Sequence, residues 1–296
     1  MSFNHDHHHK HPQESRIRLA FFMNVTFAIV EIIGGIFTNS MSIISNALHD
    51  LGDSLSLGLA WYFQRLSGKD RDTLFSFGYK RFSVLGALIN SLVLLTGSII
   101  IIAEAVPRIF HPQQIHPKGM FFLALIGITI NGIAALSLKK GDSVNERVIS
   151  LHLLEDVLGW MAVLIVSVVM NFYTLPLLDP ILSLLITIYI LWNVWKNLKS
   201  TLRIFLQATP EDSRIADIEK QLMDIHEVTG VHDLHLWSMD GLYHVLTVHV
   251  TVAGNMTLDD TQKLKKNIRS DLESIGIEHI TVEIEQEDEV CKLTDC

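Results

Sequence analysis

Apolar residues follow two different patterns along the 296-residue chain, and the pattern changes at Thr209-Pro210. Six apolar stretches precede this point, each about 20 residues long, which is the length a helix needs to cross ~30 Å of hydrocarbon. The stretches cover residues 19–37, 42–63, 83–106, 119–138, 149–171 and 178–198. We therefore predict an α-helical membrane protein with six transmembrane helices in residues 17–208 and both termini on one side.

Beyond Thr209-Pro210, the apolar positions predict a small α+β domain in residues 209–286. Spacings of three and four residues favour helices, and alternation favours strands, two of which flank the turn Asp240-Gly241. The expected order is αββαβ, with the helices packed on one face of the sheet. The predicted segments are, in chain order, 215–225, 231–239, 242–252, 264–275 and 277–286.

The charged residues divide the chain at the same place. Residues 1–208 have a net charge of +3 and residues 209–296 one of −12, so the soluble domain should not bind nucleic acid or anionic lipid. Fourteen basic residues flank the predicted helices on the side of the termini, against only Arg108 and Lys118 on the other. The positive-inside rule therefore predicts that both termini are cytoplasmic, in the inner or plasma membrane if the source is bacterial.

Both ends of the chain contain further candidate metal ligands. Residues 1–16 include five histidines, and two interpretations stay open: a zinc-collecting segment, or a disordered tail or expression tag. The flexible tail predicted for residues 287–296 holds the only cysteines, Cys291 and Cys296, so no disulfide framework is expected. For these two thiols, metal binding and a metal-free tail are equally good interpretations.

One polar motif occurs twice within the apolar stretches. His49 with Asp53 in the second stretch and His152 with Asp156 in the fifth each read HxxxD, which places both side chains on one helical face. An ionisable group near the bilayer centre costs about 2.5 to 3.5 kcal/mol, so such residues are seldom only structural. Because two imidazoles and two carboxylates suit tetrahedral Zn²⁺, we predict one zinc site from these four residues.

Several alternatives accompany this prediction. The two HxxxD pairs are also compatible with simple hydrogen bonding across packed helices. Asp50 and Glu155 stay outside the ligand set, as candidates for ligand-orienting partners, proton acceptors or surface residues. Asn24 and Glu31 share one face of the first stretch, where they either assist the site or bond to another helix.

Strand alternation in the soluble domain separates an apolar face from a polar one. Val248 and Val250 should face the core, so His249 points to the other side of the sheet. By the same rule Glu283 and Glu285 of the third strand lie on the polar face with His249. This face therefore gathers imidazole and carboxylate groups.

The doubled HxxxD, followed by the segment Val231-His232-Asp233-Leu234-His235-Leu236-Trp237-Ser238, resembles the cation diffusion facilitator family on its zinc-transporting branch. The resemblance covers nearly all of the chain after the histidine-rich tail. It implies a homodimeric metal/proton antiporter that is not an enzyme, with His49, Asp53, His152 and Asp156 as ligands. Histidine at position 49 implies Zn²⁺ as the cargo, and Cd²⁺ stays open as a second one.

The resemblance also implies a metallochaperone-like cytoplasmic domain that holds regulatory zinc. The matching positions are His232, His249 and Glu285, with His235 and His279 as neighbours. Alternation agrees for His249 and Glu285, whereas His232 has the strand parity of the core residues that follow it. A merely solvated polar sheet face is the alternative interpretation.

These features predict a secondary transporter that exports cytoplasmic Zn²⁺ in exchange for protons, because a protonated ligand cannot bind metal. An intramembrane metalloenzyme is disfavoured, since the HExxH signature is missing. A membrane-tethered zinc sensor that transports nothing is the alternative function. The loop after the second stretch has Asp70 and Asp72 but no histidine, so we predict no zinc site there.

Overall fold

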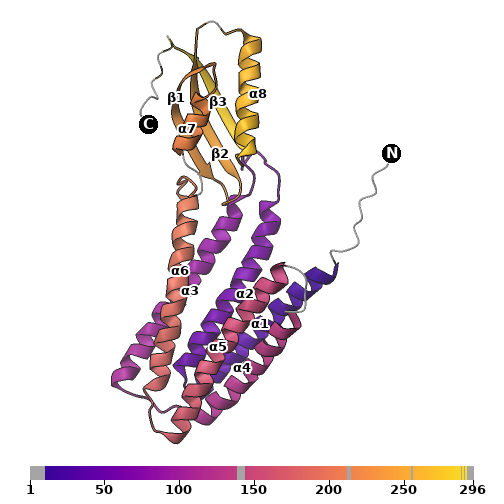
Figure 1. Cartoon of the computed structure of the whole chain (residues 1–296). Helices are drawn as coiled ribbons and strands as arrows, with labels where there is room; N and C mark the ends of the chain where they lie inside the picture. The colour runs from indigo at the N-terminus through magenta and orange to yellow at the C-terminus, as the bar shows by residue number, and fades with distance from the viewer. Residues whose placement is uncertain are drawn as a thin grey trace. The chain divides into compact units, whose positions relative to one another are not determined.

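The computed structural model describes residues 11–138, 144–211, 215–254, 256–287, 289 and 291, and at some helical positions it describes the backbone only. Most of the histidine-rich tail and Cys296 lie outside the described residues. Figure 1 shows the chain. The elements are α1 (His11–Thr38), α2 (Met41–Ser67), α3 (Arg81–Phe110), α4 (Pro117–Leu138), α5 (Val144–Phe172), α6 (Leu178–Phe205), α7 (Ile215–Met223), β1 (Val228–Ser238), β2 (His244–Val252), α8 (Leu258–Ser274) and β3 (His279–Gln286).

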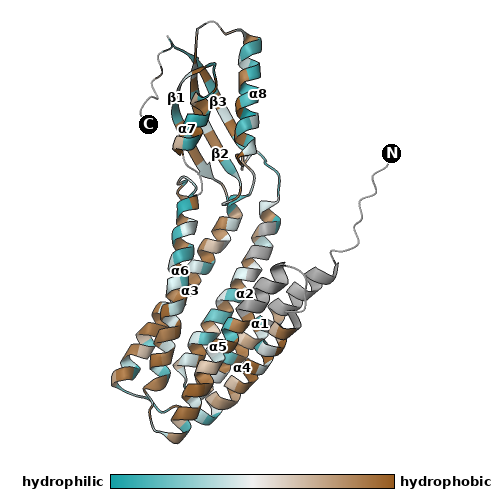
Figure 2. Cartoon of the chain, viewed as in Figure 1, coloured by the Kyte–Doolittle hydropathy of each residue, from teal (hydrophilic) through white to brown (hydrophobic). Residues whose placement is uncertain are grey.

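The long helices have the composition of a membrane domain. Within the part of the chain that the structure describes, α3, α4, α5 and α6 are long and apolar enough to span a bilayer, and α1 contributes the shorter apolar segment Asn24–Thr38. Hydrophobic residues predominate in α3–α6, while α8 is largely hydrophilic (Figure 2). A helical membrane domain followed by a small domain of order αββαβ is thus confirmed. That all six helices cross the membrane stays a prediction.

The chain forms two compact units, Met1–Tyr62 with Ile89–Asn197 and Phe63–Leu88 with Leu198–Cys296. In the first unit, α4 packs against both α5 and α1. Trp160 of α5 is fully buried in their shared core, where its ring centroid lies 5.8 Å from that of Phe27 on α1. Gly127 of α4 makes room for it, since a Cβ there would lie 2.4 Å from the indole ring. One buried indole therefore joins three helices.

The start of α2 is fixed by a carboxylate from α6. Asp179 is fully buried and accepts hydrogen bonds from the backbone N–H groups of Met41 and Ser42 and from the hydroxyls of Ser40 and Ser42. The first N–H groups of a helix have no partner inside it, and an acidic group there also complements the helix dipole. Asp179 thus fixes the helix that carries His49 and Asp53.

In the second unit a three-stranded sheet has the order β1-β2-β3, with β2 antiparallel to β1 and parallel to β3. Apolar residues of α7 and α8, including Leu222 and Ile268, share one core with Val248 and Val250 of β2. Both helices therefore cover the same face of the sheet, as predicted. The opposite face carries His249 and is free to bear polar side chains.

Candidate metal sites

The HxxxD pair of α2 meets α5 inside the first unit. Nε2 of His49 lies 3.6 Å from an Asp53 carboxylate oxygen, as the i, i+4 spacing predicts, and 3.9 Å from an Asp156 oxygen. Asp156 is buried, whereas His49 and Asp53 keep about a fifth to a quarter of their side-chain surface exposed. The structure thus brings three of the four predicted ligands together. His152 lies on α5 one turn before Asp156, but its side chain is outside the described residues.

Two buried carboxyl groups accompany this membrane cluster of His49, Asp53 and Asp156. Glu31 of α1 is fully buried and has Asp50 and Asp156 among its immediate neighbours. Asp50 is 1% exposed, so it points into the bundle rather than toward lipid. Three carboxyl groups thus crowd one interior region, which is unfavourable unless protons or a cation compensate for their charge.

Asn24 and Glu155 are the other polar residues for which the sequence left alternatives, and the structure gives each a simple environment. The Asn24 amide donates to the carbonyl oxygen of Asp50, at 3.2 Å, and to the hydroxyl of Ser54, at 3.0 Å. Asn24 therefore links α1 to α2, which is the interhelical alternative considered for it. Glu155 is exposed on α5, while its neighbour Asp156 faces the bundle.

A second cluster lies on the polar face of the sheet. His232 of β1 is the register partner of His249 on β2, and their ring centroids are 5.3 Å apart. A bulge between His232 and His235, where Asp233 has a φ of 46°, shifts the register and places His232 on this face. This irregularity explains why simple alternation placed His232 with the core residues.

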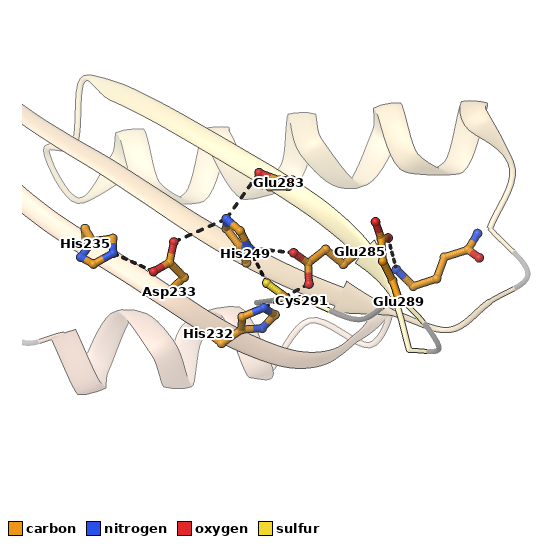
Figure 3. A network of polar contacts seen from close by, with 9 residues as sticks. His232, Asp233, His235, His249, Glu283, Glu285, Glu289 and Cys291 are labelled. Carbon is orange, nitrogen blue, oxygen red and sulfur yellow. Dashed lines mark hydrogen bonds and ion pairs between the residues drawn. The ribbon is translucent and has the colours of Figure 1, made fainter. Parts of the chain in front are cut away.

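A carboxylate from β3 connects the two imidazoles (Figure 3). One oxygen of Glu285 lies 2.7 Å from Nδ1 of His249, and the other lies 3.1 Å from Nε2 of His232. Cys291, beyond β3, adds its sulfur 3.6 Å from the same Nδ1. The ligand atoms of all four residues lie within 4.8 Å of one another. We call His232, His249, Glu285 and Cys291 the cytoplasmic cluster, after the side of the membrane that the sequence predicts for this domain.

The cluster has an outer layer of carboxylates. Nε2 of His249 points away from Glu285, toward oxygens of Asp233 at 3.5 Å and Glu283 at 3.4 Å. Burial alone would raise the pKa of Glu285, but hydrogen bonds with Cys291 and His249 and the nearby imidazoles together hold that pKa below its ordinary value. The ionised carboxylate, which is the form that binds metal, is therefore favoured.

The two neighbouring histidines named from the sequence lie outside this group of four. His235 is about half exposed and hydrogen-bonds to Asp233 at 2.8 Å. His279 is the register partner of Val245 at the start of β3, six positions before Glu285. Sequence reasoning did not place Cys291 or Asp233 in the site, because neither the bulge nor the path of the chain after β3 leaves a signal in residue spacing.

Comparison with known proteins places both units in a wider context. A family model described as the cation efflux transmembrane domain matches residues 17–206, and one described as the cation efflux protein cytoplasmic domain matches residues 210–287. The two matched segments meet where the apolar pattern changes.

Whole proteins with known names are also similar to this chain. A protein of Bacillus subtilis named cadmium, cobalt and zinc/H(+)-K(+) antiporter is 31% identical over 95% of this chain and 92% of its own length. The metal cation efflux system protein CzcD of Cupriavidus metallidurans is 32% identical, over 96% and 90% respectively. The zinc transporter ZitB of Yersinia pseudotuberculosis is 32% identical, over 95% and 90%.

Proposed function

The chain belongs to the cation efflux (cation diffusion facilitator) family, and we propose that it is a secondary transporter that exports Zn²⁺ from the cytoplasm in exchange for protons. The observation that carries this proposal is the convergence of His49, Asp53 and Asp156 from two helices at one point inside the helical unit. His152 is the proposed fourth ligand, on the same helix as Asp156. Imidazole and carboxylate ligands suit Zn²⁺, and Cd²⁺ stays a second candidate cargo.

Proton exchange follows from the chemistry of these ligands. An imidazole or carboxylate binds metal only when it is deprotonated, so Zn²⁺ and protons compete for the same side chains. Histidine is the residue whose ordinary pKa lies near neutrality, which lets modest pH differences shift that competition. A site open to the cytoplasm loads Zn²⁺, and the same site open to the other side exchanges it for protons that return inward.

The cytoplasmic part of the proposal concerns control. We place a tail in residues 1–16, the membrane domain in 17–208, the cytoplasmic domain in 209–286 and a second tail in 287–296, with both termini in the cytoplasm. The protein is proposed to be a homodimer in which His232, His249 and Glu285 bind regulatory zinc. The Glu285 oxygens lie 2.7 Å from Nδ1 of His249 and 3.1 Å from Nε2 of His232, which supports a shared metal site. Such control requires that zinc binds two transporter conformations with different affinity.

A membrane-tethered zinc sensor that transports nothing is the second candidate. It would use the cytoplasmic cluster alone and leave the membrane cluster without a role. The buried Asp156 beside His49 favours transport, because a carboxylate is expensive to bury in a membrane helix without a function.

The decisive experiment measures Zn²⁺ uptake into liposomes that contain the purified protein, with and without a pH gradient. We expect uptake that rises with the gradient in the parent and falls to the level of protein-free liposomes in Asp53→Ala and Asp156→Ala. Glu104→Ala is the matched control, since this carboxylate on α3 is about half exposed and pairs with Arg108. Parent-like uptake in both aspartate variants would refute the proposed transport site.

A further inference from the structure

Cys291 supplies a sulfur atom to the cytoplasmic cluster. Its Sγ lies 3.6 Å from Nδ1 of His249, and it also hydrogen-bonds to Glu285. We propose that Cys291 is the fourth ligand of a closed, tetrahedral zinc site formed with His232, His249 and Glu285 within a single chain. The inference rests on the proposed regulatory role of this cluster. To the three ligands proposed above it adds a thiolate, so that the bound metal has no open coordination position.

The separations of the four ligand atoms fit this geometry. With ordinary Zn–N, Zn–O and Zn–S bond lengths, the ligand atoms of a tetrahedral site lie about 3.3 to 3.7 Å apart. All four ligand atoms of the cluster already lie within 4.8 Å of one another. Binding therefore requires the widest separation to shrink by about 1.5 Å at most, and the 2.7 Å contact between His249 and Glu285 to lengthen, which side-chain rotation can supply.

The imidazole rings are oriented for metal binding. Nδ1 of His249 faces Glu285 and Cys291, while its Nε2 faces Asp233 and Glu283, the arrangement in which a metal-bound histidine donates its other N–H to a carboxylate. Nε2 of His232 is buried and lies 3.1 Å from Glu285, yet it makes no hydrogen bond of acceptable geometry. Both inward nitrogens thus face the same carboxylate: Nδ1 of His249 is hydrogen-bonded to it, and Nε2 of His232 lies beside it without a hydrogen bond.

Charge and ligand type favour Zn²⁺ or Cd²⁺. Two neutral imidazoles, one carboxylate and one thiolate balance a divalent ion, and thiolate shifts the preference toward borderline and soft metals. Four protein ligands leave no open coordination position, which is the pattern of non-catalytic zinc sites. Zinc in this site would tie the segment after β3 to the sheet, because Cys291 comes from that segment while the other ligands come from β1, β2 and β3.

The test uses full-length protein in detergent with Co²⁺ as the probe. A cobalt–thiolate bond gives an intense charge-transfer absorption in the near ultraviolet, which nitrogen and oxygen ligands do not produce. We expect this absorption in the parent and its loss in Cys291→Ser. If the parent shows no such absorption, or if Cys291→Ser retains it, the proposal is wrong.

Three control variants locate the thiolate. Cys296→Ser should keep the absorption, because it removes the chain's other cysteine, and Asp53→Ala should keep it, because the membrane cluster contains no sulfur. His249→Ala should lose it, and its retention there would mean that Cys291 binds cobalt elsewhere, which overturns the proposal. The liposome assay tests the proposed function separately. A parent protein that shows the cobalt–thiolate absorption but takes up no Zn²⁺ would refute the proposed function alone. A parent protein that takes up Zn²⁺ but lacks the absorption would refute only this inference.

A second measurement needs no variant. Cys291 is partly exposed, so iodoacetamide should alkylate its thiolate in metal-free protein, with iodide as the leaving group. Zn²⁺ should slow this alkylation at least about tenfold, because a metal-bound thiolate is a poor nucleophile, and a chelator should restore the rate. Peptide mass spectrometry would follow Cys291 and Cys296 separately. Equal alkylation of Cys291 with and without Zn²⁺ would overturn the proposal.

Discussion

His49 in the membrane cluster lies 3.6 and 3.9 Å from its two carboxylates, whereas His249 in the cytoplasmic cluster lies 2.7 Å from Glu285. The side chains of His49 and Asp53 are 21% and 27% exposed, against 10% and 8% for His249 and Glu285. The two clusters therefore combine imidazole and carboxylate in different ways. One is loose and partly open at His49 and Asp53, and the other is tighter, better buried at His249 and Glu285, and supplemented by sulfur.

The difference matches the two tasks proposed for the clusters. A transport site has to take up its ion on one side and release it on the other, so loosely held and accessible ligands are an advantage. A site that reports a metal concentration gains from a fixed geometry and an outer layer of oriented carboxylates such as Asp233 and Glu283. The comparison predicts that each cluster can be disabled without the other.

The largest effect is expected from His49→Ala. This change removes the imidazole at the centre of the membrane cluster, so proton-driven Zn²⁺ uptake into liposomes should fall to background. Zinc bound by the cytoplasmic cluster should be unchanged when it is measured through protection of Cys291 from alkylation. Loss of both properties would remove the distinction between the clusters.

His111→Ala is the matched control for His49→Ala. His111 is exposed in the segment between α3 and α4, so the variant also loses one imidazole, but at a position outside both clusters. Parent-like uptake is expected. An equal loss of uptake in this variant would attribute the effect of His49→Ala to general damage rather than to a ligand.

A smaller effect on transport, and a large one on binding, is expected from His249→Ala. Zinc affinity of the cytoplasmic cluster should fall by more than the roughly 10- to 100-fold loss that follows removal of an outer-layer partner. Transport should change less, because coupling between separate sites is typically about 1 to 3 kcal/mol. The control is His235→Ala, whose half-exposed ring lies outside the group of four. An equal loss of affinity there would contradict the proposed ligand set.

The sequence was most informative where the geometry is local. The i, i+4 spacing of His49 and Asp53 and the alternation of Val248, His249 and Val250 depend only on helix and strand periods. Both arrangements appear in the structure. The meeting of His49 with Asp156 depends on how α2 and α5 pack, and the doubled motif suggested it only through the chemistry of the residues.

Other parts of the sites could not be predicted from spacing. The bulge at Asp233 inverts the strand parity of His232, and a positive φ at a non-glycine residue has no reliable sequence signal. Cys291 follows the last strand, so its return to His249 depends on the path of a short tail. Glu31 was predicted only to share a helix face with Asn24, and its proximity to Asp50 depends on how α1 packs on α2.

A moderate effect is expected from Gly127→Ala on α4. A methyl group there would lie 2.4 Å from the ring of Trp160, which is fully buried beside Glu31, so the helices have to move apart. Overpacking of this kind costs about 1 to 3 kcal/mol. Thermal unfolding in detergent should shift downward and Zn²⁺ uptake should fall, while cytoplasmic zinc binding persists. Gly132→Ala on the same helix, where an added Cβ meets nothing within 4 Å, should match the parent.

The smallest effect is expected from Asp72→Asn, in the loop between α2 and α3 where no zinc site is predicted. Asp72 accepts hydrogen bonds from the Tyr79 hydroxyl at 2.6 Å and from the N–H groups of Leu74 and Phe75 at 2.8 Å, and these bonds, that of Tyr79 foremost, lower its pKa. A carboxyl whose folded pKa is depressed stabilises the fold above its ordinary pKa, and this contribution is lost as the pH falls through the folded pKa. Asp72→Asn should remove that pH dependence from thermal unfolding below about pH 4. The bound zinc, measured by elemental analysis, should not change, and a loss of zinc would mean that a third site exists in this loop beside the two compared above.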